Sequence, residues 1–227
     1  MVRRMRRPID LVIFDCDGVL VDSETIAQEL LRDTLAEHDL ALPIDTVQRT
    51  FQGRSLPAVR ETLKAEFGLA LPAEAFGGMD ATLLARFTHE LRPIAGIAEL
   101  VAALGVPACV ASSSHTARLR HALAVTGLSE GFGTNVFSAD EVERGKPAPD
   151  LFLHAAARMG ARPERCIVVE DSPAGIEAAR AAGMEPVGFT AGSHACGDAY
   201  AERLRAAGAV EIARTASDLQ ALLPQKA

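Results

Sequence analysis

Two aspartates follow an apolar run close to the start of the chain. The run covers residues 9–14 and leads into Asp15-Cys16-Asp17-Gly18. An Asp-Gly pair after a strand is also ordinary turn chemistry, so this segment alone does not identify a site. If the run is a strand of an open α/β sheet, both carboxylates lie at the end of the strand where such sheets bind ligands. Asp15 could then act as a nucleophile, and Asp17 could transfer protons.

Polar residues also follow a second apolar run at residues 107–111. The segment Ser112-Ser113-Ser114 offers hydroxyl and backbone N–H groups that could hold phosphate oxygens. A polar loop that caps a helix beginning near Thr116 explains these serines equally well.

Two further polar segments lie later in the chain. Glu170-Asp171 follows the apolar run at 167–169, where the two acids could bind a metal or merely complement the dipole of the next helix. Lys146 lies in the stiff segment Gly145-Lys146-Pro147, and a single lysine of this kind is usually a solvated surface charge.

Taken together, these segments supply what phosphoryl transfer requires. A carboxylate that attacks a phosphate dianion is repelled by it, so cations must lie between them. Magnesium prefers a few oxygen ligands, which predicts a site made of side-chain oxygens of Asp15 and Asp171 and the main-chain carbonyl of Asp17. Glu170 would orient a bound water, and Lys146 would keep Asp15 ionised.

Asp17 is placed two residues from Asp15 to protonate a leaving alkoxide and then to deprotonate the water that hydrolyses an aspartyl phosphate. That role requires Asp17 to hold a proton at the start. Gly18 would allow the backbone to turn and to approach the metal without a side-chain clash.

Short apolar runs alternate with Ala-rich amphipathic stretches along most of the chain. This alternation predicts an α/β fold with a doubly wound parallel sheet. The expected strands are 9–14, 107–111, 167–169 and 186–189, and the expected helices between and after them are 97–104, 150–159 and 175–182.

One interval shows helical periodicity without a convincing strand. Its expected helices are 26–37, 56–66 and 81–91. We therefore expect a catalytic core formed by residues 1–23 and 92–227, with a helical cap at 24–91. Both ends of such an insertion return to the same edge of the sheet, which makes it a lid over the strand ends.

The net charge of −7 and the pI of about 5.4 predict no general attraction to nucleic acid or to an acidic membrane surface. The arginines at residues 3–7 precede an apolar run that is too short for a signal peptide or a membrane span. We therefore expect a cytoplasmic protein.

The four cysteines stand singly, without a CxxC pair. Buried, reduced thiols are therefore expected at Cys16, Cys109, Cys166 and Cys196. His194 and Cys196 lie close in sequence, but no further pair nearby completes a metal site.

The four segments resemble the signature motifs of the haloacid dehalogenase superfamily, and the resemblance covers nearly the whole chain. Longer stretches are similar to the subgroup that has a helical cap inserted after the first motif. The matching stretches are Asp15 to Glu24, Ser112, Gly145-Lys146-Pro147-Ala148-Pro149-Asp150, and Val169-Glu170-Asp171-Ser172-Pro173-Ala174-Gly175-Ile176.

This resemblance implies a role for each matching residue. Asp15 would be the nucleophile and Asp17 the general acid/base, and the last acids, Glu170 and Asp171, would bind Mg²⁺. The phosphoryl group would be held by Ser112 and Lys146, with Ser113, Ser114 and Gly18 beside it. The cap would contact substrate around Gln52-Gly53-Arg54-Ser55, where Arg54 either binds a substrate anion or is an exposed arginine at the start of a helix.

A phosphomutase similar to β-phosphoglucomutase is the main enzymatic alternative. Such mutases have a histidine on the first cap helix and a lysine and an arginine beside the cap glycine, where this chain has Ala27, Gln52 and Leu56. These three departures favour hydrolysis. The expected substrate is a small phosphorylated metabolite such as a sugar or sugar-acid phosphate, and the expected state is a monomer, with a dimer also compatible.

Three other functions fit the sequence less well. A dehalogenase needs neither a general acid nor magnesium, so Asp17 and the Glu170-Asp171 pair argue against it. A receiver-type signalling domain has its acid pair at the first strand and its phosphorylated aspartate later, and it lacks a helical lid. A phosphate-binding module without catalysis is disfavoured because every expected catalytic position carries a chemically competent residue.

Overall fold

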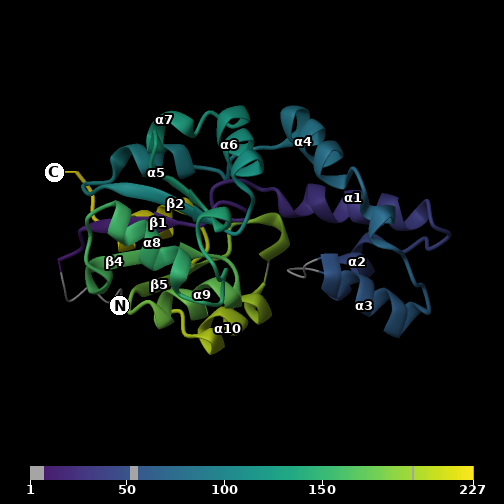
Figure 1. Cartoon of the computed structure of the whole chain (residues 1–227). Helices are drawn as coiled ribbons and strands as arrows, with labels where there is room; N and C mark the ends of the chain where they lie inside the picture. Colours follow the sequence, from purple (N-terminus) through teal and green to yellow (C-terminus); the bar gives the residue numbers. More distant parts are fainter. Residues whose placement is uncertain (1–7, 52–55, 196, 227) are drawn as a thin grey trace.

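A computed structural model describes residues 8–51, 56–195 and 197–226 of the chain. Its centre is a six-stranded sheet in the order β3-β2-β1-β4-β5-β6, and all neighbouring strands are parallel (Figure 1). The strands are β1 (Leu11–Phe14), β2 (Ala108–Ser112), β3 (Val136–Ser138), β4 (Cys166–Glu170), β5 (Glu185–Phe189) and β6 (Glu211–Ala213).

The first strand lies in the middle of the sheet, between β2 and β4. Val12 is aligned with Ala108 on one side and with Ile167 on the other. All four residues of β1 are buried, as expected for a parallel strand that is covered on both faces. Leu11 and Ile13 contact one hydrophobic cluster and Val12 and Phe14 another, so the alternation of side chains divides the core into two layers.

Helices cover both faces of this sheet. The layer that packs on Val12 and Phe14 comes from α5 (Ile97–Ala103), α6 (Thr116–Val125), α7 (Ser129–Phe132) and α11 (Ala216–Leu222). The layer on Leu11 and Ile13 comes from α8 (Asp150–Arg158) and α9 (Pro173–Ala181), and α10 (Asp198–Ala207) packs beside α9. Short 3-10 turns are η2 (Ala139–Glu141), η3 (Pro163–Arg165) and η4 (Ser193–Ala195).

The predicted α/β class is confirmed, and all four predicted core strands are present within two residues of their expected bounds. Two strands, β3 and β6, were not predicted. Each has only three residues and lies at an edge of the sheet, so neither produces the unbroken apolar run that identifies a central strand.

The segment between β1 and α5 is helical. It contains α1 (Glu24–Ala36), α2 (Ile44–Phe51), α3 (Leu56–Phe67), η1 (Ala73–Phe76) and α4 (Met79–Glu90). Figure 1 shows α1 running away from the sheet toward α2 and α3, while α4 returns toward α6. We refer to α1–α4 as the cap helices; α2 was not predicted, and the expected domain boundaries remain a prediction.

The cap helices have a hydrophobic cluster of their own. Leu31 and Leu35 on α1 pack with Phe51 and Leu63 on α2 and α3. Other residues of α1, including Ile26 and Leu30, belong instead to the large cluster of the core. Helix α1 therefore lies between two separate apolar clusters.

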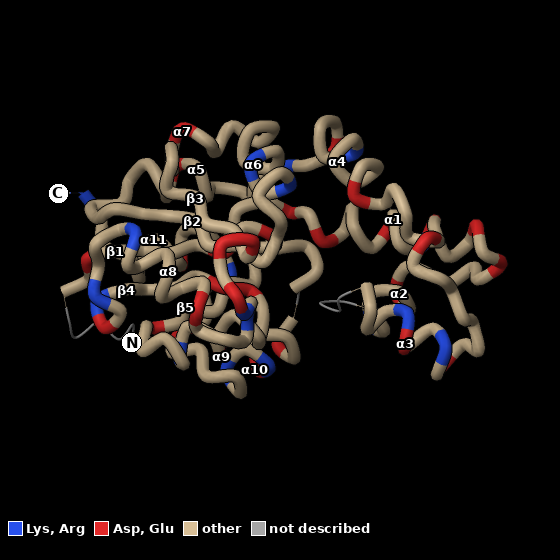
Figure 2. Tube along the Cα trace, in the orientation of Figure 1, with Lys and Arg blue, Asp and Glu red and all other residues tan. Residues whose placement is uncertain are grey.

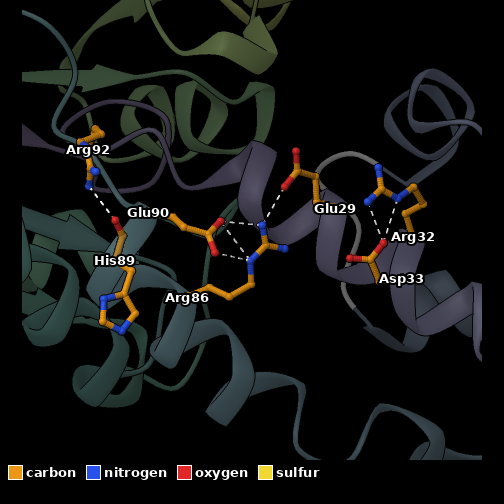
Figure 3. A network of polar contacts seen from close by, with 7 residues as sticks. All are labelled: Glu29, Arg32, Asp33, Arg86, His89, Glu90 and Arg92. Carbon is orange, nitrogen blue, oxygen red and sulfur yellow. Dashed lines mark hydrogen bonds and ion pairs between the residues drawn. The ribbon is translucent and has the colours of Figure 1, made fainter.

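An arginine joins the first and last cap helices at the surface (Figure 3). Arg86 on α4 lies 2.6 Å from Glu90 on the same helix and 2.7 Å from Glu29 on α1. Because these side chains are partly exposed, their ion pairs contribute little to the stability of the fold.

Charges are dispersed in the described part of the chain. Figure 2 shows Lys and Arg scattered among Asp and Glu over both the sheet layers and the cap helices. Within the described ranges, no helix is long and apolar enough to cross a membrane.

Candidate active site

Lys146 connects two of the acids that the sequence analysis singled out. Its Nζ lies 2.5 Å from Oδ1 of Asp15 and 2.7 Å from Oε1 of Glu170, and it also donates to the carbonyl of Ala111. The ammonium lies 4.8 Å from the centre of the Phe152 ring. Only 5% of the lysine side chain is exposed, so Lys146 is a buried cation and not a solvated surface charge.

The electrostatic environment of this group is dominated by its acids. Burial raises the pKa of Asp15 well above its ordinary value; Lys146 opposes that shift, and the charges of Glu170 and Asp171 add to it. Burial lowers the pKa of Lys146, but the two carboxylates outweigh this and raise it overall. Lys146 is therefore charged, and it does not by itself offset the negative charge around Asp15.

Asp171 lies beside the loop that follows β1. Its Oδ2 is 2.7 Å from Nε2 of His194, and both side chains are almost completely buried. Burial and the neighbouring charges of Glu170 and Glu24 raise the pKa of Asp171 well above its ordinary value. A Cβ on Gly18 would lie 2.0 Å from Oδ2 of Asp171, so only glycine permits this close approach.

Asp17 has different neighbours from Asp15. Its Oδ1 accepts hydrogen bonds from Ser23 at 2.5 Å and from Arg118 at 3.0 Å, and its Oδ2 accepts one from Ser114 at 2.6 Å. Burial raises the pKa of Asp17, but the charge of Arg118 and the hydroxyl hydrogen bonds outweigh burial and lower it. This environment favours the ionised form, the opposite of what the sequence analysis required at the start of a reaction.

The serine loop continues from the end of β2. Ser112 is buried, and its hydroxyl accepts the backbone N–H of Ser114. Ser113 is exposed and lines the same cavity as its neighbours. The predicted alternative, that these serines cap the next helix, is wrong for α6, because Asp140 accepts the backbone N–H of Thr116.

The acids at the end of β4 do not cap the following helix either. Ser172 caps α9 by accepting the N–H of Gly175, and Oε2 of Glu170 accepts from both the backbone and the hydroxyl of Ser172. A Cβ on Gly175 would lie 1.8 Å from Glu170 Oε1. Glu170 is therefore fixed by its neighbours with one oxygen directed to Lys146.

One cavity of about 750 Å³ collects these groups at the carboxyl ends of the strands. It is also bounded by the cap residues Glu24, Leu56, Asp80 and Leu84. The predicted site residues that line it are Asp15, Asp17, Ser112, Ser113, Ser114, Lys146, Glu170 and Asp171. Gly53 and Arg54, together with Gln52 and Ser55, lie outside the described residues.

Among the cavity residues that the sequence analysis missed, Arg118 and His194 contact predicted site residues. Arg118 follows the serine loop within the first turn of α6, but its sequence context resembles a solvated helix face. His194 follows β5, so a search of every strand end would have found it as a neighbour of Asp171 and not only as a partner for Cys196. Cys196 lies outside the described residues, and Cys16, Cys109 and Cys166 are buried free thiols, as predicted.

The donor set fits a divalent cation. Three buried carboxyl groups, those of Asp15, Glu170 and Asp171, line the cavity with the single ammonium of Lys146, and burial lowers the pKa of the neighbouring His194. Among the described residues, no three Asp, Glu, His or Cys side chains already form a metal cage. That arrangement suits Mg²⁺, which takes one or two carboxylates and completes its shell with water and substrate oxygens.

Two curated phosphatases are similar to this chain in sequence. The chain is 34% identical over 187 residues to a 6-phosphogluconate phosphatase of Escherichia coli K12, covering 82% of this chain and 85% of that one. It is 34% identical to the fructose-1-phosphate phosphatase YqaB of the same organism, covering 78% and 94%.

A solved structure is similar over nearly its whole length. It is a HAD family hydrolase of Deinococcus radiodurans R1 with bound phosphate and sodium; the TM-score is 0.81, the identity 34%, and the coverage 96% of this chain and 99% of that one. The sequence model of the haloacid dehalogenase-like hydrolases matches residues 9–183. The motifs, the sheet and these matches establish that the chain belongs to the haloacid dehalogenase-like hydrolase family.

Proposed function

We propose that this protein is a magnesium-dependent phosphatase that hydrolyses a small phosphorylated metabolite through a phosphorylated Asp15. The observation that carries the proposal is the buried contact of Lys146 with both Asp15 and Glu170, in a cavity that also contains Asp17 and Asp171. The phosphatases among its relatives support the same class of reaction.

In the first step, a carboxylate oxygen of Asp15 attacks phosphorus, and the bond between phosphorus and the ester oxygen breaks. The leaving alkoxide takes a proton from Asp17 and departs as an alcohol. Ser112, Ser113 and Ser114 supply hydroxyl and N–H groups for the phosphoryl oxygens. Lys146 offsets the charge between nucleophile and phosphate.

In the second step, Asp17 takes a proton from water while the water oxygen attacks phosphorus. The bond between phosphorus and Asp15 breaks, which releases phosphate and restores the carboxylate. Arg118 lowers the pKa of Asp17 and so opposes its protonation. A negatively charged phosphoryl group bound beside Asp17 has the opposite effect, so the substrate itself promotes protonation of Asp17.

Asp15, Asp171 and the main-chain carbonyl of Asp17 would hold Mg²⁺, with Glu170 acting through water. When bound, the ion neutralises negative charge on the phosphoryl group and on the carboxylates. Gly18 keeps the backbone of the first loop close to Asp171.

Phosphoryl transfer to water is favoured over return to a sugar. Mutases similar to β-phosphoglucomutase have a proton-carrying histidine at the position where this chain has Ala27. Ala27 lines a cavity between the cap helices and carries no titratable group. The substrates proposed are sugar or sugar-acid monophosphates, in line with the names of the relatives.

The proposal is tested with purified protein, Mg²⁺ and p-nitrophenyl phosphate. Wild type should release phosphate, and excess EDTA should stop the release. Asp15→Asn should lower kcat at least about 10⁴-fold, the scale reached when a catalytic nucleophile is removed. Intact-mass spectrometry of acid-quenched wild type should detect a phosphorylated chain that Asp15→Asn does not form.

Asp10→Asn is the matched control, because it makes the same change before β1, where Asp10 pairs with Arg165 away from the cavity. It should leave kcat within about 2-fold of wild type. Turnover by Asp15→Asn at the wild-type rate would refute the assigned nucleophile. Conversion of glucose 1-phosphate to glucose 6-phosphate without release of phosphate would identify a mutase instead.

A further inference from the structure

A second, smaller cavity lies within the cap. It has a volume of about 210 Å³, and its walls come from α1, α2, α3 and α4, together with Arg118 on α6. Leu30 and Leu83 on its walls belong to the apolar cluster of the core, whereas Leu31, Phe51 and Val59 belong to the cluster of the cap. The cavity therefore occupies the seam between the two hydrophobic clusters.

This cap cavity adjoins the catalytic cavity. Glu24, Leu56, Asp80 and Arg118 line both. Leu56 is 40% exposed despite being a large apolar residue, which is consistent with a side chain at the junction of two open spaces. A molecule whose phosphoryl group reaches Asp15 thus has a second space available beyond this junction.

One polar side chain in the wall of the cap cavity lacks a partner. Gln28 on α1 is 5% exposed, and neither its amide nitrogen nor its amide oxygen has a hydrogen-bond partner among the described residues. Most of the other residues on the cavity wall, such as Leu30, Leu31 and Val59, are apolar. A buried amide left unpaired is destabilising, and a group of this kind in a cavity wall requires an explanation.

We propose that the cap cavity binds the hydroxylated carbon chain of a polyol monophosphate and that the amide of Gln28 binds one of its hydroxyl groups. This inference rests on the proposed phosphatase function. A carboxamide both donates and accepts hydrogen bonds, as a hydroxyl does. The amide atoms of Gln28 are buried, and a rotation of the side chain would direct them into the space that the residue lines. The apolar walls suit the C–H groups of the chain.

The charges at the junction favour a neutral chain over one with a second anion. Glu24 and Asp80 contribute carboxyl groups there, and the guanidinium of Arg118 is already paired with Asp17. Burial raises the pKa of Glu24, so Asp80 is the main source of negative charge at the junction. A carboxylate or second phosphate on the substrate would meet these acids. The structure thus assigns the protein to sugar-alcohol phosphates in preference to sugar-acid phosphates or bisphosphates.

The test compares kcat/KM for sorbitol 6-phosphate, glycerol 3-phosphate and 6-phosphogluconate, each with Mg²⁺. Wild type should prefer the six-carbon polyol to the three-carbon one, because only the longer chain reaches the cap cavity. Gln28→Leu should lower this preference about 3- to 10-fold, the worth of one neutral hydrogen bond. Ala27→Leu, which fills the same cavity and leaves the amide in place, should also lower it.

Thermal unfolding distinguishes a binding role for Gln28 from a structural one. If the amide is unpaired in the ligand-free protein, Gln28→Leu should raise Tm by about 2 °C or more. Gln48→Leu is the matched control, since it makes the same change on α2 at a residue that lines neither cavity. It should leave the substrate preference unchanged.

A lower Tm for Gln28→Leu with an unchanged preference would show a structural glutamine and overturn the inference. A higher kcat/KM for 6-phosphogluconate than for sorbitol 6-phosphate would overturn the assignment to neutral chains. Both results would leave the phosphatase function intact, because that function is judged separately by Asp15→Asn with p-nitrophenyl phosphate.

Discussion

Asp15 and Asp17 are two residues apart on one loop, yet their surroundings move their pKa values in opposite directions. Burial raises the pKa of both carboxyls. Asp15 has Lys146 as its cation, which it shares with Glu170, whereas Asp17 has Arg118 and two hydroxyl donors to itself. The comparison shows that the positive charge available to each carboxyl, and not its depth of burial, separates the pKa values of Asp15 and Asp17.

Each of these two pKa shifts is the reverse of what the proposed chemistry needs. A nucleophile must be ionised, and burial raises the pKa of Asp15; an acid must hold a proton, and Arg118 lowers the pKa of Asp17. A cation bound beside Asp15 would lower the pKa of Asp15, and a phosphoryl anion bound beside Asp17 would raise the pKa of Asp17. In the proposed mechanism, both ligands are therefore needed to give the two carboxyls the protonation states that catalysis requires.

The largest effect that sharpens this comparison is expected from Asp17→Asn. The amide keeps the shape of the carboxyl but replaces one of its two acceptor oxygens by a donor, and it cannot carry the catalytic proton, so kcat should fall about 10²- to 10⁴-fold. Trapping of phosphorylated Asp15 with a good leaving group such as p-nitrophenol should persist, because the first step then needs little help from an acid. Rapid-quench measurement separates the two steps, and an unchanged kcat would assign the proton transfer to water.

Magnesium binding provides the next largest effect. At a Mg²⁺ concentration about 100 times Kd, the wild type should gain about 2.7 kcal/mol, or roughly 5–10 °C in Tm. Asp171→Asn should lose most of this gain. Without metal it should be at least as stable as wild type, because burial and Glu170 raise the pKa of Asp171 and make its ionisation costly.

The sign of the pH dependence follows from the same shift. The pKa of Asp171 is higher in the folded protein than in the unfolded chain, where it is about 3.9. The contribution of Asp171 to stability is therefore fully present below the unfolded-state pKa and is lost as pH rises through the folded-state pKa. In EDTA, the Tm of wild type should therefore fall relative to Asp171→Asn as pH increases. If Mg²⁺ raised the Tm of both proteins by the same amount, the ion would bind elsewhere. Asp198→Asn, which changes an exposed side chain at the start of α10, serves as the control.

The sequence predicted those parts of the site that follow long apolar runs. Residues 11–14 and 166–170 are buried on both faces of a parallel sheet, so their composition alone reveals the strand, and the next acids are found by position. The contact of Lys146 with Asp15 was predicted only by combining all four segments. The edge strands β3 and β6 were not predictable in this way, because three residues carry too little pattern.

Site residues that lie on helices were harder to predict from the sequence. Gln28 belongs to a cap helix whose apolar residues divide between two clusters, and a single amphipathic pattern cannot show which polar residue falls in the seam. Arg118 is flanked by Leu119 and Arg120, a pattern equally typical of a solvated surface. Its partner, Asp17, is about 100 residues earlier in the chain, and only the folded sheet brings them together.

The smallest of these effects tests Arg118 as a positioning residue for Asp17. Arg118→Met keeps an unbranched apolar stem but removes the guanidinium, which donates to Asp17 and lies over the Phe87 ring, so kcat should fall about 10-fold, the scale of one charge-assisted hydrogen bond. Since Arg118 lowers the pKa of Asp17, its removal should shift the limb of the kcat–pH profile governed by Asp17 to higher pH. Arg118→Lys should restore part of that shift, because it returns the charge without the planar fork. A slower enzyme with an unmoved profile would show that Arg118 only packs against the cap, and the difference between Asp15 and Asp17 would then depend on the serines alone.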